Sequence, residues 1–338
     1  MIKTNKYKIF VALVTTILSL TAGTAFADIL VLGGKPAGSL WYAQAQALSA
    51  TVGKHSDMRV DVLPQAGTVF FPMFGTKEVD MGIGSPVEAV LAYKAEPPFE
   101  NANKGKGYEM RTIMLGSPIS LTLVTRKDSG IGSVAELKGK RVVANYGQFV
   151  GSTLTARSVL ANAGLTVDDI SMVSASSYTE GVRAVIEGRA DAAVGSIGSG
   201  ILQELDASVG AKLLEIDPSP EAMARTQDVG SAFVAQLVKK GPVGIDQDTY
   251  TLSYSTTIYA RPDIDNAQVE TFINTIWNHH QELPKIHRSL ATWTPDRFAS
   301  VEAVVPYHPA AIKFYKERGV WSEALDARQA ELLQERKN

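Results

Sequence analysis

Two segments of the chain, 113 positions apart, repeat one order of apolar and polar residues. Each begins with a short apolar run, Leu30-Val31-Leu32 in the first half and Val143-Ala144 in the second, and continues into a loop that contains glycine. An Ala-rich stretch with apolar positions at helical spacing follows, at 40–52 and at 153–163. The pattern predicts a strand, a loop and a helix in each half.

Small hydroxyl residues stand at corresponding places in the two halves. Ser39 and Ser152 each follow a glycine where a helix is expected to start, and Thr68 and Thr179 recur at a spacing of 111. Serine and threonine are favoured helix N-caps, so these four residues are predicted to cap helices.

A second repeat extends the correspondence and sets the fold class. Segment 80–85 and segment 191–196 both begin with Asp and end with Gly-Ser after a short apolar run, as expected of a buried strand. Alternating strands and helices indicate parallel sheets with helices on both faces, so two α/β lobes of similar plan are expected.

Two longer apolar runs, Ile119 to Arg126 and Tyr250 to Ala260, have the composition of strands that cross between such lobes. The first lobe would then contain both ends of the chain. The expected division is a signal peptide at 1–27, lobe I at 28–124 and 251–338, and lobe II at 125–250.

The N-terminus has the three parts of a secretory signal. Lys3, Lys6 and Lys8 precede an apolar stretch at 9–23, and Ala25-Phe26-Ala27 provides small residues for cleavage. Threonine and serine interrupt that stretch, which is short for a permanent membrane anchor, the alternative interpretation. The sequence therefore predicts export to the periplasm, where nucleotide cofactors are scarce.

Composition narrows the function further. The 338 residues carry a net charge of −2, and because three lysines and no acid precede residue 28, the remainder is more acidic still. Such a chain is not expected to bind nucleic acid. The absence of cysteine excludes disulfides, thiolate metal sites and a cysteine nucleophile.

Ligands of open α/β sheets bind beyond the carboxyl ends of the strands, beside helix N-termini whose free amides attract anions. If the two lobes face each other, the matched loops converge on one cleft that suits a small organic anion. Aromatic residues near these loops, Trp41, Phe70, Phe71 and Phe149, would add an apolar wall. The predicted ligand-binding residues are Lys35, Gly38, Ser39, Tyr42, Thr68, Ser85, Tyr146, Gly151, Ser152, Thr153, Thr179 and Ser196.

No catalytic constellation is evident. The chain has no dinucleotide fingerprint, phosphate-binding loop or Gly-x-Ser-x-Gly elbow. His279 and His280 would point about 100° apart on a helix, and His55, His287 and His308 are scattered along the chain. The protein is therefore expected not to be an enzyme, and no cofactor or resident metal ion is predicted, although a metal ion that bridges protein and carboxylate stays open.

Several motifs, in order, resemble a known family. They are the loop 33–42 (GGKPAGSLWY), the segments 128–131 and 137–142, Thr155-Ala156-Arg157 with Ala163-Gly164-Leu165, and the late segment 308–315 (HPAAIKFY). Together they resemble the TAXI-type extracytoplasmic solute-binding proteins of tripartite ATP-independent periplasmic (TRAP) transporters. The resemblance implies a type II periplasmic-binding-protein fold, with two α/β lobes joined by two hinge strands.

The resemblance also implies a function. The protein would capture a small organic anion, such as a dicarboxylate, keto acid or amino acid, and deliver it to the membrane permease subunits of a TRAP transporter. Phe149-Val150 and Phe70-Phe71 stand where the family often has polar residues, which favours a ligand with an apolar portion. The alternatives are a binding protein of an ATP-driven importer or a sensor system and, from another class, an exported serine hydrolase.

Overall fold

The computed structural model describes residues 29–335, so the predicted signal peptide lies outside the described residues. Its ten strands form one continuous sheet, whose main path has the order β2-β1-β3-β10-β4-β7-β5-β6. The strands are β1 (Ile29–Gly34), β2 (Arg59–Pro64), β3 (Met81–Gly84), β4 (Arg111–Arg126), β5 (Arg141–Asn145), β6 (Ser171–Ser174), β7 (Ala192–Ser196), β8 (Ala211–Leu213), β9 (Val234–Val238) and β10 (Thr249–Ala260).

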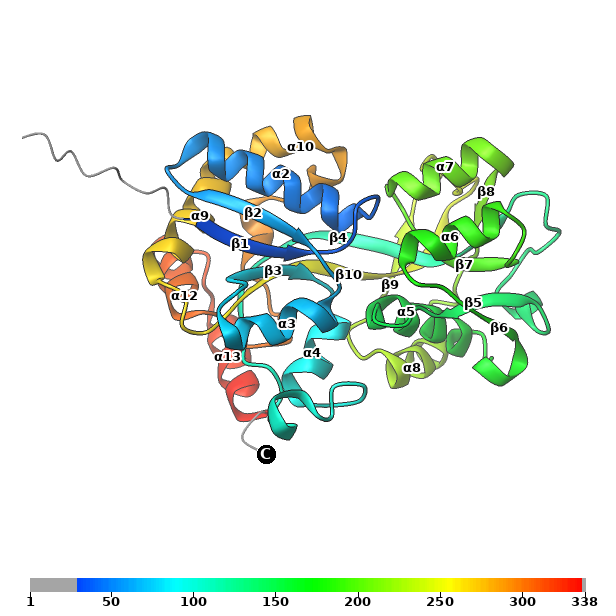
Figure 1. The fold of residues 1–338 in the computed structure, drawn as a ribbon, viewed down its shortest axis with the longest axis horizontal. Helices are drawn as coiled ribbons and strands as arrows, with labels where there is room; N and C mark the ends of the chain where they lie inside the picture. Colours follow the sequence, from blue (N-terminus) through cyan, green and yellow to red (C-terminus); the bar gives the residue numbers. More distant parts are fainter. Residues whose placement is uncertain (1–28, 336–338) are drawn as a thin grey trace, which may run out of the picture.

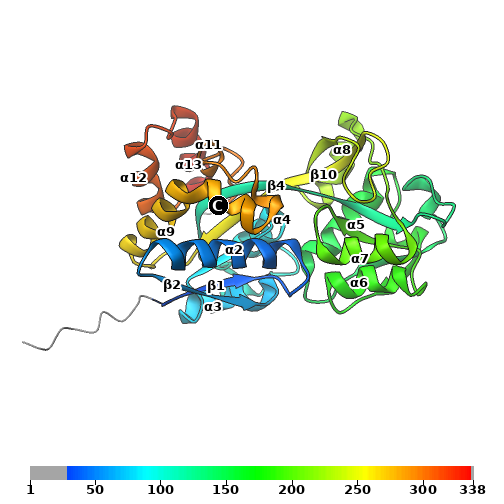
Figure 2. The same ribbon diagram turned by 90° about the horizontal axis from the view of Figure 1, so that it is seen from above.

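Helices cover both faces of this sheet, as the alternating pattern predicts, and the chain divides visibly into two lobes (Figures 1 and 2). The helices are α2 (Leu40–His55), α3 (Gly67–Thr76), α4 (Pro86–Lys94), α5 (Val150–Asn162), α6 (Tyr178–Ile186), α7 (Gly200–Val209), α8 (Pro220–Val229), α9 (Asn266–His279), α10 (Leu283–Ile286), α11 (Pro295–Phe298), α12 (Pro309–Glu317) and α13 (Glu323–Glu335). Within residues 29–335, no helix combines the length and apolar composition needed to cross a bilayer.

The two lobes share one plan. In lobe I, β1 pairs in parallel with β2 and β3, and β3 pairs antiparallel with β10. In lobe II, β5 pairs in parallel with β6 and β7, and β7 pairs antiparallel with β4. Each lobe is therefore a parallel three-stranded unit that ends on a long antiparallel strand.

Two long strands, β4 and β10, pass from one lobe to the other (Figure 1). They pair with each other from Arg111↔Ala260 to Leu121↔Leu252. Both predicted crossing runs fall inside these strands, while the proposed lobe boundaries at 124/125 and 250/251 remain a prediction.

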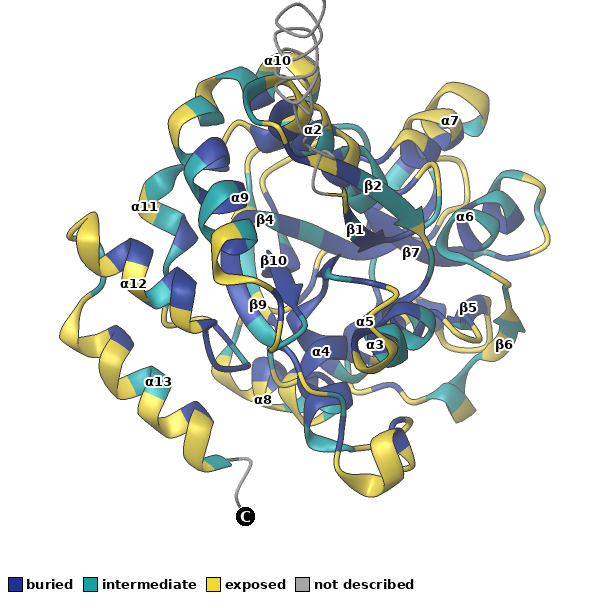
Figure 3. Ribbon diagram, turned by 60° about the vertical axis from the view of Figure 1, so that its left-hand side comes forward, coloured by how far each residue is buried: buried dark blue, intermediate teal, exposed yellow. Residues whose placement is uncertain are grey.

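The apolar cores follow the two lobes. One cluster of buried side chains fills lobe II, and two others fill lobe I around β1, β3 and α9. The middle strands are buried on both faces, whereas outer helices such as α13 expose one side (Figure 3). Leu40, Ala66 and Val87 come from lobe I but pack in the cluster of lobe II, so the lobes are in contact.

Candidate functional site

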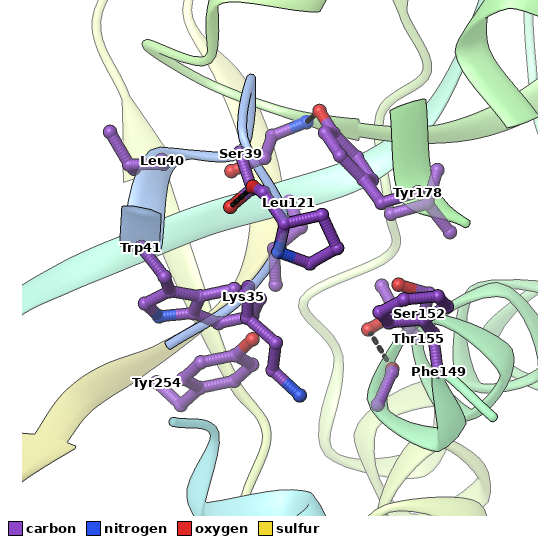
Figure 4. Close-up of a pocket in the computed structure, with 14 residues that line it drawn as sticks. Lys35, Ser39, Leu40, Trp41, Leu121, Phe149, Ser152, Thr155, Tyr178 and Tyr254 are labelled. Carbon is purple, nitrogen blue, oxygen red and sulfur yellow. Dashed lines mark hydrogen bonds between the residues drawn. The ribbon is translucent and has the colours of Figure 1, made fainter. Parts of the chain in front are cut away.

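A pocket lies where the N-termini of α2 and α5 face each other between the lobes (Figure 4). The loop after β1 supplies one side, and the start of α5 and the end of β7 supply the other. The pocket is lined by Lys35, Pro36, Ser39, Leu40, Trp41, Leu121, Phe149, Gly151, Ser152, Thr155, Tyr178, Val194, Ser196 and Tyr254.

A buried ion pair lies beside this pocket. Lys35 Nζ donates to Glu88 Oε2 at 2.6 Å, and the two side chains are only 6% and 1% exposed. Figure 4 shows the Lys35 side chain extending between Tyr254 and the start of α5. Lysine and glutamate are seldom buried unless they are paired, so this pair is a marked feature of the interior.

Backbone from both lobes encloses the Glu88 carboxylate. A Cβ added at Gly67 would lie 2.6 Å from Oε1, and one added at Gly151 would lie 3.4 Å from Oε2. Oε1 has no hydrogen-bond partner among the described residues. A buried carboxylate oxygen is costly to leave unpaired, so Oε1 is an exception among the buried polar atoms of this interior.

Aromatic rings form the apolar wall of the pocket. Trp41 stacks on Tyr254 with ring centroids 6.1 Å apart, and the Lys35 ammonium lies 5.7 Å from the Trp41 ring centroid. Tyr178 lies across the pocket, where its hydroxyl accepts from the Ser196 N–H at 3.0 Å. Burial raises the pKa of Tyr178 to about 12, so it stays neutral.

Three of the predicted hydroxyl residues stand where the repeats place them. The prediction that Ser39 is a helix cap is confirmed, because its Oγ accepts from the Tyr42 N–H at the start of α2. Ser85 follows β3 and caps α4 in the same way, and Ser196 ends β7. Both strand ends therefore point toward the contact between the lobes.

The other three predicted caps are wrong. Helix α5 begins at Val150, so Ser152 lies inside its first turn, and α3 begins at Gly67 without a side-chain cap, so Thr68 lies inside that helix. Helix α6 is capped by Ser177, which places Thr179 one residue inside it. In each case the helix starts one or two residues earlier than the hydroxyl residue.

Among the twelve predicted ligand-binding residues, five line the pocket: Lys35, Ser39, Gly151, Ser152 and Ser196. Tyr42 follows Trp41 on α2 and is partly exposed. The Thr153 hydroxyl accepts from the Tyr146 N–H at 2.9 Å, within its own loop. Neither residue is among those that line the pocket.

Tyr146 needs a correction, because it lies in the core of lobe II. Its side chain is fully buried, and its hydroxyl accepts from the Val194 N–H at 2.8 Å. Phe70 and Phe71 also differ from the expected position at the mouth of the cleft. Helix α3 turns both toward the sheet, where Phe70 lies against Gly33 and Gly82.

Direct contacts hold the two lobes together around the pocket. Thr68 Oγ1 donates to the Gln148 carbonyl at 2.8 Å across the gap. Gly38, at φ +86°, would place a Cβ 3.2 Å from Thr179 Cγ2 of lobe II. The free space in the pocket is about 30 Å³, which has room for a water-sized molecule. The lobes must separate before a larger solute can enter.

Sequence reasoning missed Glu88, Leu121, Thr155, Tyr178 and Tyr254. Glu88 was the most accessible of these to prediction, since it is the only acid in helix α4 and lies in its apolar first half. Tyr254 lies on β10, one of the crossing strands, and reaches the pocket from the middle of the molecule. Tyr254 reaches the pocket only because of how the two lobes pack together, and the repeat pattern carries no information about that packing.

Several solved structures are similar to this chain. PhnD1 from Prochlorococcus marinus, in complex with methylphosphonate, matches with a TM-score of 0.53 at 14% identity, covering 87% of this chain and 99% of that one. The periplasmic aliphatic sulphonate binding protein SsuA from Escherichia coli matches with a TM-score of 0.48 at 14% identity, covering 89% and 91%. The substrate binding protein of an amino acid ABC transporter matches with a TM-score of 0.43 at 12% identity, covering 79% and 99%.

Two parallel units joined by a pair of long crossing strands, with helix N-termini that face each other, define the type II periplasmic-binding-protein fold. Comparison of the sequence with known families identifies the family to which the chain belongs. Residues 32–319 match the NMT1-like family, so this chain belongs to that family.

Proposed function

We propose that this protein captures a small organic anion between its lobes and delivers it to a membrane transporter. The observation that carries the proposal is the buried Lys35–Glu88 pair between the N-termini of α2 and α5. An ammonium group has three N–H donors and Glu88 takes one, so two remain for a carboxylate or another anion.

The helix that faces this ion pair adds further donors. The first amides of α5, at Val150 and Gly151, have no acceptor within the helix and lie at the positive end of its dipole. Trp41 and Tyr254 supply an apolar surface for the rest of the ligand.

Capture is proposed to occur by lobe closure about β4 and β10. A solute settles on one lobe, and the second lobe then completes its surroundings. Closure changes the outer surface, so a permease can distinguish the loaded protein from the empty one. The proposed division into lobe I (28–124 and 251–338) and lobe II (125–250) places the two crossing strands at the hinge.

The partner we propose is a TRAP-type permease, on the strength of the TAXI-like motifs at 33–42 and 308–315. The alternative partner is an ATP-driven importer or a sensor system. The predicted signal peptide implies that the protein acts in the periplasm. The two partners are distinguished by measuring uptake of the identified solute in cells that lack the TRAP-type permease and in cells that lack the ATP-driven importer. Uptake should be lost only in the cells that lack the true partner.

Solute binding is tested by mass spectrometry of small molecules released from the purified, denatured protein. Carboxylates, keto acids, amino acids, sulfonates and phosphonates are then screened by thermal unfolding. A ligand that binds only the folded protein raises its stability by RT ln(1+[L]/Kd). No released acid and no stabilisation by any member of the panel would contradict the proposal.

A further inference from the structure

A cluster of metal-ligating side chains lies on lobe I, away from the pocket. His55 ends α2, His279 ends α9, and Glu282 lies in the 3-10 turn (His280–Glu282) that follows α9. Helix α2 starts at the pocket and has 16 residues, so the cluster lies about 24 Å from it at ~1.5 Å per residue. Figures 1 and 2 show α2 lying beside α9 on the outer side of the lobe.

The donor atoms in this cluster are spaced as ligands of one metal ion. Glu282 Oε1 lies 3.1 Å from His55 Nε2 and 3.5 Å from His279 Nδ1, and one ligand atom of each residue lies within 4.8 Å of the others. Two ligands at about 2.0–2.1 Å from a tetrahedral zinc ion are about 3.3–3.4 Å apart. The two measured distances bracket that separation.

We propose that His55, His279 and Glu282 bind a divalent transition-metal ion, with Zn²⁺ as the best fit. Two imidazoles and one carboxylate form a donor set that suits zinc, and a water molecule would complete four-coordination. The site would tie the C-terminal end of α2 to the end of α9. His55 and His279 are 224 positions apart in the chain and adjacent in the fold, a contact that their sequence positions do not indicate.

Zinc binding depends on the orientation of the two imidazole rings and on the charge of the Glu282 carboxylate. The imidazole rings are stacked, with centroids 3.6 Å apart and planes at 6°, so one ring must rotate to direct both lone pairs at one ion. The His55 and His279 side chains are 19% and 34% exposed, which leaves room for that rotation. Hydrogen bonds from Lys54 and His55 lower the pKa of Glu282 to about 2, so its carboxylate is ionised at neutral pH.

Lys54 competes with the metal ion. Its ammonium donates to Glu282 Oε2 at 2.6 Å, and its side chain is 64% exposed, so it can move into solvent. Removal of this positive charge should strengthen zinc binding, because the ion would no longer displace or lie beside an ammonium.

The test titrates the tag-free full-length protein with Zn²⁺ alone, by calorimetry and by competition with a chromophoric chelator. We expect one ion per chain, a tenfold or greater loss of affinity in each of His55→Gln, His279→Gln and Glu282→Gln, and tighter binding in Lys54→Met. Circular dichroism confirms that each variant is folded. Co²⁺ in place of Zn²⁺ should give the intense visible absorption of a tetrahedral site.

His280→Gln is the matched control, because His280 Nδ1 contacts the Trp277 carbonyl and His280 is not part of the cluster. This variant should bind zinc as the unaltered protein does. The proposal is overturned by the absence of binding at micromolar zinc, by equal binding in all ligand variants, or by unchanged affinity in Lys54→Met. The result does not depend on which solute occupies the pocket.

Discussion

Lys35 and Glu88 place opposite charges where little water reaches them. Burial of each charge alone is unfavourable, and the pair is tolerated because the two groups bond directly. Glu88 lies in the first turn of α4, whose dipole also favours a negative charge. The pair therefore keeps an ammonium group at the pocket without leaving an isolated charge in the interior.

The first prediction separates the structural role of this pair from its role in binding. Lys35→Met leaves Glu88 unpaired, so the free energy of unfolding in urea should fall by about 3–5 kcal/mol. Lys35→Met combined with Glu88→Leu should recover most of that loss, because no buried charge remains. The double variant should still fail to bind the solute, and full binding by it would contradict the assigned role of Lys35.

A second prediction compares the two matched serines. Ser39 caps α2, so Ser39→Ala should lower the free energy of unfolding by about 0.5–2 kcal/mol in the absence of ligand. Ser152 lies inside α5 and lines the pocket, so Ser152→Ala should reduce solute affinity and leave stability nearly unchanged. Urea unfolding and calorimetry on both variants check this, and equal stability losses would contradict it.

At the scale of elements, the hydrophobic pattern predicted the central strands of both lobes, the two crossing strands, and the helices α2 and α5. The apolar runs correspond to β1, β5, β3 and β7, and the crossing runs lie within β4 and β10, because burial on both faces leaves a continuous apolar run. Helix starts were less predictable. Helices α5 and α3 begin without a side-chain cap, so the expected hydroxyl signal is absent at both.

Tyr146 shows why a residue in a predicted binding loop can belong to the core. Its loop turns the ring inward against Gly181, where a Cβ would lie 2.5 Å from Cε1 of the ring. Tyr146 lies in the loop between β5 and α5, but the sequence contains no signal for the direction of its side chain. That direction depends on α6 and β7, which lie more than 30 residues further along.

A third prediction follows for this residue. Tyr146→Phe keeps the ring but leaves the buried Val194 N–H without its acceptor, so unfolding should become easier by about 1–3 kcal/mol. Solute affinity should not change. Tyr178→Phe is the comparison: it removes the hydroxyl that accepts from the N–H of Ser196, which lines the pocket, so that variant should weaken binding as well. Thermal unfolding and calorimetry distinguish the two, and weaker binding in Tyr146→Phe would contradict its place in the core.

At the scale of the whole molecule, the site depends on contacts between lobes that are remote in sequence. Gly151 of lobe II meets Glu88 of lobe I, and Tyr254 joins the pocket from a crossing strand. Internal repeats predicted that two similar lobes exist and that their loops converge. The repeats could not predict which side chains meet across the gap, because each half encodes its own fold rather than the fit of one half to the other.

Lobe closure gives the last prediction. Thr68 donates to the Gln148 carbonyl only when the lobes are together, so Thr68→Val should favour the open form. A lost hydrogen bond of about 0.5–1.5 kcal/mol should weaken solute binding about 2–10-fold. Calorimetry measures the affinity, and small-angle scattering should show a larger radius of gyration at subsaturating solute.

Thr179→Val is the matched control for this change. Its hydroxyl bonds to Ser177 within lobe II, and valine keeps the methyl group that faces Gly38. This variant should bind the solute as the unaltered protein does. Equal losses of affinity in Thr68→Val and Thr179→Val would show that β-branched apolar substitution, rather than the bond between the lobes, is responsible. An unchanged affinity in Thr68→Val would mean that other contacts, such as those of Leu40 and Val87 with the core of lobe II, control closure.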